Sequence, residues 1–154
     1  MAANTNNLDV TAALTQCLSG KQDQRRQGEA AVARLALEQI DAYALALTRL
    51  LIHNDTALPS RQLAASQLAL LELARLLPAS RNAVKSVLLP AISVDWQSSP
   101  LRNAFCHVIT KIAAIDYPDC WPELVPALLS HIGPQVRYAS VLNFRARPML
   151  YKLF

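Results

Sequence analysis

Helix starts recur along this chain at a regular interval, and the recurrence limits the possible folds more than any other feature. The second helices of successive helical pairs are expected to begin near Asp23, Ser60 and Ser99. A spacing of about 40 residues is typical of HEAT and armadillo repeats, in which each helical pair buries its apolar face against its neighbours. We therefore predict an all-α fold, an α-solenoid of antiparallel helix pairs with about three pairs and one extra helix.

The composition favours the same fold class. The chain of 154 residues is 53% hydrophobic with only 3 glycines and 6% aromatic residues. Leucine and alanine, both strong helix formers, recur throughout, whereas runs of β-branched residues are short. A chain of this length and hydrophobicity can bury a core as one unit.

Apolar residues at helical spacing and turn residues between them predict the individual helices. The expected helices are 8–18, one that starts at Gln22 or Asp23, 40–53, 60–77 with Ser60 as its cap, 80–92, 99–115 and 121–132. In the second of these, Ala30, Ala33, Leu35 and Leu37 are expected to form the apolar side.

Each second helix carries an arginine in its opening turns, followed within the next turn by an alanine. These arginines are Arg26, Arg61 and Arg102. A small residue lets neighbouring helices approach, so the arginine can reach across to the next repeat or face a partner. The alternative interpretation is that they are ordinary arginines in alanine-rich helices.

The segment 112–124 predicts a joint between two stacked repeats, because an apolar helix ends there in a proline-bracketed turn and a new helix begins. Asp119 or Cys120 is expected to cap the new helix, with Pro122 in its first turn and Glu123 near the positive end of the helix dipole. The residues that define this joint motif are Asp116, Pro118, Trp121, Pro122 and Glu123.

The joint motif, together with Glu29-Ala30, Arg61-Gln62-Leu63-Ala64-Ala65 and Val108-Ile109, resembles the amino-terminal repeats of the importin-β (karyopherin-β) superfamily of nuclear transport receptors. The resemblance covers roughly residues 8–132, taken as one HEAT-repeat region, and residues 133–154 are expected to form a non-repeat tail without a stable element. Two segments, Arg61-Gln62-Leu63-Ala64 and Leu88-Leu89-Pro90, are most similar to one branch of the superfamily.

This resemblance implies binding of the small GTPase Ran in its GTP form through the second helices, and a location in cytoplasm and nucleus. It also implies contact with the Phe-Gly repeats of nuclear pore proteins, and transport of protein cargo only by a longer chain. The sequence departs from the family pattern after Gln67-Leu68, where the usual lysine and tryptophan are absent. The second pair is therefore expected to be shortened, and the chain is expected to be truncated.

No residue pattern predicts a catalytic, metal or cofactor site. Cys106 and His107 are adjacent on a predicted helix, and Cys120 adds too few ligands for a zinc site. No apolar run reaches the roughly 20 residues that a membrane helix needs, and a net charge of +4 is too small to indicate direct nucleic-acid binding. A short HEAT-repeat scaffold for protein–protein interaction remains the alternative to a transport receptor, and an enzyme is the least favoured class.

Overall fold

The computed structural model describes residues 5–93, 96 and 98–130, and for residues 5–9 it describes the backbone alone. The chain divides into two compact units, residues 1–111 and 112–154, and each unit is described by itself. The predicted tail, 133–154, lies outside the described residues.

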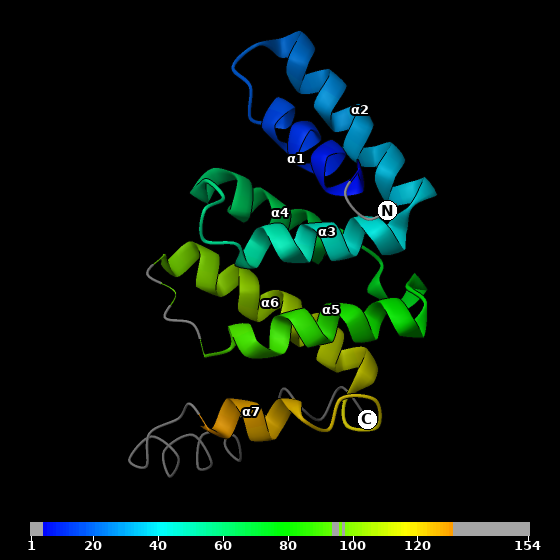
Figure 1. Cartoon of the computed structure of the whole chain (residues 1–154), viewed down its shortest axis with the longest axis vertical. Coiled ribbons are helices and arrows are strands. Elements are labelled where there is room, and N and C mark those ends of the chain that lie inside the picture. Colours follow the sequence, from blue (N-terminus) through cyan, green and yellow to red (C-terminus); the bar gives the residue numbers. More distant parts are fainter. Residues whose placement is uncertain (1–4, 94–95, 97, 131–154) are drawn as a thin grey trace, which may run out of the picture. The chain divides into compact units, whose positions relative to one another are not determined.

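Helices make up the regular structure of the part of the chain that is described, and no strand occurs there, so the predicted all-α class is confirmed. The helices are α1 (Thr5–Cys17), α2 (Gln22–Glu38), α3 (Ile40–Ile52), α4 (Leu58–Leu70), α5 (Pro78–Ala91), α6 (Ser99–Asp116) and α7 (Leu124–Ser130), with a 3-10 turn, η1 (Leu73–Arg75), between α4 and α5. Consecutive helices pack as pairs, as in a small HEAT-like α-solenoid (Figure 1).

Helix α3 is the centre of the first unit. It packs against its pair partner α4 and against α5 of the next pair, and α1 lies against it from the other side (Figure 1). Burial follows this position, because α3 contributes more buried residues than α2 or α4: Tyr43, Ala44, Ala46, Leu47, Thr48 and Leu51. The buried Thr48 hydroxyl donates a hydrogen bond of 2.7 Å to the carbonyl of Ala44, so its polar group is satisfied within the helix.

The predicted apolar side of α2 is wrong for three of its four residues. Ala30, Ala33 and Leu37 are exposed, Leu35 is half-buried, and the buried residues of α2 are Gly28 and Val32. The physical reason is that α2 crosses α1 at Gly28, which brings the face centred on this glycine into contact. A glycine contributes nothing to an apolar pattern in the sequence, so most of the pattern pointed to another face.

Three helix boundaries differ from the prediction, and prolines account for two of them. Helices α4 and α5 begin at Leu58 and Pro78, with a proline in the first turn, and no side-chain cap is formed at either start, so the predicted cap at Ser60 is wrong. Proline suits this position because it has no N–H to leave unpaired. Helix α4 ends at Leu70 rather than near residue 77, since Leu71 is extended and η1 follows.

The packing of α2 on α1 depends on the missing side chain of Gly28. A Cβ atom at this position would lie 2.6 Å from the backbone nitrogen of Cys17 and 2.8 Å from the carbonyl oxygen of Ala13. Both are backbone atoms of α1, which cannot move aside as a flexible side chain can. A larger residue therefore forces the two helices apart.

We expect Gly28→Ala to lower the free energy of unfolding by about 1–3 kcal/mol, the usual range for overpacking. The matched control is Gly20→Ala, because a Cβ at Gly20 meets nothing within 4 Å. That variant should be neutral or slightly more stable, since alanine restricts the unfolded chain. Urea denaturation followed by circular dichroism measures both, and equal effects of the two substitutions would contradict the proposed close contact.

Tyr43 carries a buried hydroxyl group. Its side chain is 1% exposed, and among the described residues its hydroxyl has no hydrogen-bond partner. Burial raises the pKa of the Tyr43 phenol above its ordinary value, and the nearby Cys17 thiol adds to the shift. The folded protein therefore holds the phenol proton more tightly than the unfolded chain does.

The raised pKa of Tyr43 predicts a loss of stability at alkaline pH. Below about pH 10 the phenol is protonated in both states, and above it the unfolded chain loses the proton first, so stability falls as pH rises. Tyr43→Phe should make this decline shallower, and Tyr117→Phe, at a position 47% exposed, should not. Urea denaturation at several alkaline pH values measures the decline, and parallel curves for wild type and Tyr43→Phe would refute the assignment.

Candidate interaction surface

The three predicted arginines lie in different environments. Arg61, in the first turn of α4, is half-buried, and its Nε–H donates a hydrogen bond of 2.9 Å to the carbonyl of Leu51 near the end of α3. The guanidinium carbon also lies 5.3 Å from the centroid of the Trp96 ring, which is a cation–π distance. Burial lowers the pKa of Arg61 below its ordinary value.

Trp96, which contacts this arginine, lies in the connection between α5 and α6. Its ring is 8% exposed and stacks in a tilted arrangement on Phe105 of α6, with ring centroids 4.8 Å apart. Its indole N–H donates a hydrogen bond of 3.2 Å to the carbonyl of Ala91, the last residue of α5. The Arg61 side chain therefore links the second helical pair to both helices of the third pair through one tryptophan.

Two further polar contacts join the second and third pairs, and neither is predicted from the sequence. Asp41, in the first turn of α3, accepts a hydrogen bond of 2.9 Å from the backbone N–H of Leu77, just before α5. Lys111 of α6 donates to the carbonyl of Ala69 near the end of α4. A carboxylate in the first turn of a helix and a lysine within a helix are too common for sequence alone to identify such links.

Arg26 and Arg102 are exposed, and neither contacts an aromatic ring among the described residues. The guanidinium of Arg102 donates a long hydrogen bond of 3.5 Å to Ser99, a local contact within the first turn of α6. The position equivalent to that of Trp96, one repeat earlier, is the connection 53–57 between α3 and α4, and it contains no Phe, Trp or Tyr. Both side chains are therefore available to a partner, whereas Arg61 is not.

The second helices do not form one continuous row in the first unit. Helix α2 packs on α1 and touches α3 beside their connection, whereas α1 lies against both α3 and α4 (Figure 1). Arg26 on α2 and Arg61 on α4 therefore do not occupy neighbouring positions on one helix layer. The three arginines therefore have different environments. Their role between repeats or at a partner surface stays a prediction.

The joint motif belongs to the second unit. Trp121 is 2% exposed and Asp116 is 4% exposed, while Pro118, Pro122 and Glu123 are exposed. The backbone N–H of Ala127 donates to the carbonyl of Glu123 at 3.0 Å, so α7 begins after Glu123 rather than at residue 121. Of the acidic residues at the joint, Asp119 and Glu123 face solvent and Asp116 does not.

The backbone of the joint turn is closed by local hydrogen bonds. The N–H of Tyr117 donates to Ala113 at 2.9 Å, and the N–H of Cys120 donates to Asp116 at 2.7 Å. The Tyr117–Pro118 peptide bond is cis. The proline-bracketed turn is therefore present, and the cap at Asp119 or Cys120 stays a prediction.

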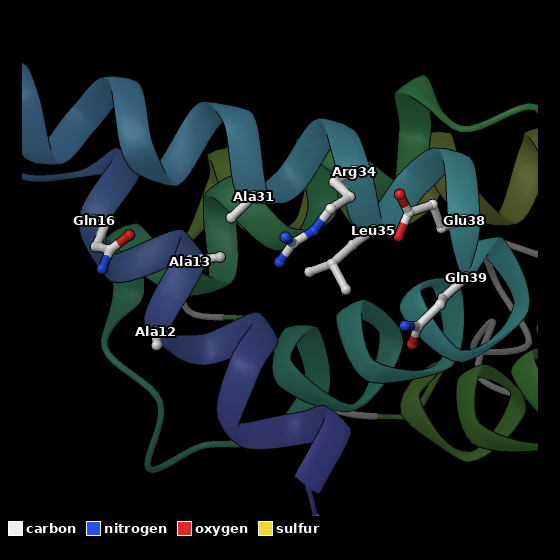
Figure 2. A pocket seen from close by; sticks show the side chains of 8 residues that line it. All are labelled: Ala12, Ala13, Gln16, Ala31, Arg34, Leu35, Glu38 and Gln39. Atoms are coloured by element: carbon white, nitrogen blue, oxygen red, sulfur yellow. The ribbon is translucent and has the colours of Figure 1, made fainter.

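A hollow of about 330 Å³ lies between α1 and α2 (Figure 2). Ala12 and Ala13 of α1 face Ala31 and Leu35 of α2 across it, and the Arg34 guanidinium extends over it. Gln16, Glu38 and Gln39 complete the lining. Small side chains on both helices leave this space open.

The structure brings together no metal-binding set among the residues that it describes. Cys106 and His107 are exposed on α6, and no group of three or more His, Cys, Asp and Glu side chains in the described part of the chain is placed to hold a metal ion. None of the helices within the described ranges combines the length and apolar character that crossing a bilayer requires.

Comparison with known proteins finds a similarity over part of the chain. No protein-family model matches the chain. A segment of 65 residues, 41% of the chain, is 29% identical to importin subunit beta-5 of Saccharomyces cerevisiae, and the matched segment is 6% of that protein's length. This similarity supports a relationship to the importin-β family at most, and it does not distinguish among the branches of that family.

We expect Arg61→Lys to lower the free energy of unfolding by about 1–2 kcal/mol, because lysine keeps the charge but loses the Nε–H bond and the planar contact with Trp96. Arg26→Lys, at an exposed position, should change it by less than about 0.5 kcal/mol. Urea denaturation followed by circular dichroism compares the two. A loss for Arg26→Lys as large as that for Arg61→Lys would show that Arg61 has no special structural role.

Proposed function

We propose that this chain is the amino-terminal HEAT-repeat segment of a nuclear transport receptor of the importin-β type, which binds Ran-GTP and takes part in protein import into the nucleus. The observation that carries the proposal is the agreement between the helical-pair fold and the 65-residue similarity to a yeast importin subunit. The chain acts as a binding module and performs no reaction of its own. Cytoplasm and nucleus are its proposed locations.

Within the superfamily, we assign the chain to the importin-9 type. The support for this placement is local sequence alone, at Arg61-Gln62-Leu63-Ala64 and Leu88-Leu89-Pro90. Nuclear pore proteins with Phe-Gly repeats are the proposed further partners. Protein cargo requires the additional repeats of a longer chain, because the matched segment is 6% of the yeast protein.

Exposure selects the residues that are proposed to contact Ran. Arg26 on α2 and Arg102 on α6 are exposed second-helix cations, and they offer their guanidinium groups to carboxylates on the partner. Arg61 has its Nε–H and one face of its guanidinium engaged inside the repeat stack. Arg61 therefore supports the surface and does not form part of it.

A HEAT-repeat adaptor without transport activity is the second candidate function. The shortened second pair favours it, since α4 ends at Leu70 and a 3-10 turn replaces the end of the expected helix. A receptor surface that depends on a longer second helix in this pair would be incomplete in this chain. Enrichment of proteins unrelated to transport in a pull-down with the purified chain would support the adaptor.

A titration with Ran tests the proposed function. The folded chain should bind Ran loaded with a non-hydrolysable GTP analogue more tightly than Ran-GDP in isothermal titration calorimetry. Arg26→Ala and Arg102→Ala should each weaken binding by about threefold to tenfold without changing the melting temperature, because exposed ion pairs contribute modestly. Arg49→Ala is the matched control and should bind like wild type. Arg49 is exposed on α3, which is the first helix of the second pair and not one of the second helices.

Equal affinity for the two nucleotide forms of Ran, or no binding by a chain that circular dichroism shows to be folded, would refute the transport-receptor function. The adaptor function would then be the one to pursue.

A further inference from the structure

Helix α2 is the outer helix of the first pair, and it packs mainly on α1. Of its 17 residues, only Gly28 and Val32 are buried. It packs on α1 and meets α3 beside Gln39, whereas α1 contacts α3 and α4 as well (Figure 1). Since α1 lies between α2 and α4, α2 covers one side of α1 and little else.

The contact between α1 and α2 is close at one position and open at another. Gly28 lies directly on the backbone of Cys17 and Ala13. The hollow of about 330 Å³ lies beside Ala31 and Leu35, further along α2 (Figure 2). The hollow therefore reduces the packing of α2 around Ala31 and Leu35, and residues 22–27 at its start are exposed.

The sequence of α2 adds little stability of its own. A glycine in the interior of a helix lowers its intrinsic stability, and Gly28 lies near the middle of α2. Arg34 and Glu38 are four residues apart, yet no ion pair joins them among the described residues, and the order Arg then Glu is the less favourable one. Helix α2 therefore depends on its contact with α1.

The rest of the first unit is held more firmly. Helices α3 and α5 are joined by the hydrogen bond between Asp41 and Leu77, and α3, α4 and the third pair by Arg61. Lys111 joins α6 to α4. Elements with few buried contacts open at lower free energy than elements that are tied into the core.

We propose that α2 acts as a lid that undocks from α1 in a local opening, while α3, α4 and α5 remain folded. The opening uncovers the face of α1 that includes Ala13 and Cys17. This inference is independent of any interaction with Ran, because it rests on the packing within the first unit alone.

Cys17 reports on this opening. It is half-buried beneath α2, since a Cβ at Gly28 would lie 2.6 Å from its backbone nitrogen. Burial raises the pKa of the Cys17 thiol, and the charge of Glu29 on α2 contributes to the shift. Cys106 on α6 is exposed and serves as an internal reference for uncovered thiols.

The experiment is thiol labelling of the intact chain with iodoacetamide under native conditions, followed by peptide mass spectrometry. Cys17 should label more slowly than Cys106, and its labelling should depend on urea much less steeply than global unfolding does. Ala31→Leu adds apolar atoms to the hollow and should slow Cys17 labelling by about tenfold. Ala33→Leu, at an exposed position on α2, is the matched control and should leave the rate unchanged.

Three outcomes would overturn the proposal that α2 acts as a lid. Labelling of Cys17 as fast as that of Cys106 would show that α2 does not cover the thiol. A urea dependence equal to that of global unfolding would show that α2 opens only when the whole unit unfolds. Equal effects of Ala31→Leu and Ala33→Leu would show that the hollow does not control the opening.

Discussion

The position of the Arg61 guanidinium between the Leu51 carbonyl and the Trp96 ring holds the second and third helical pairs in one arrangement. The carbonyl lies near the carboxyl end of α3, where the helix dipole is negative and favours a cation. The ring provides a face with partial negative charge on the other side. Both interactions leave the guanidinium half-buried with compensated charge, so the side chain can fill the space between two repeats.

The fold could be predicted to a large extent from the sequence, because helix periodicity and proline position are local properties. The helix order and the antiparallel pairs follow from the spacing of apolar residues and turns. The exact starts of α4 and α5 differ because Pro59 and Pro78 are accepted within the first turn and make a serine cap unnecessary. The exposed face of α2 could not be predicted, since it depends on where Gly28 crosses another helix.

The candidate surface shows where sequence reasoning reaches its limit. Recurrence in the sequence identified Arg26, Arg61 and Arg102 as equivalent, but their roles depend on residues one repeat away. Arg61 has Trp96 within reach, whereas the connection 53–57 offers Arg26 no Phe, Trp or Tyr ring. The burial of Asp116 beside the exposed Asp119 is likewise a matter of tertiary packing, which the spacing of acidic residues does not reveal.

Helix α1 lies against both α3 and α4, and α2 lies outside it. Helix α1 therefore takes part in two packing arrangements, because it pairs most extensively with α2 and also contacts both helices of the next pair. A boundary drawn at residue 40, where the repeat pattern places it, would separate α1 from α3 and α4. Repeats of this chain are thus not interchangeable modules, since a first helix exchanged from another pair would have to fit its own partner and the next pair at once.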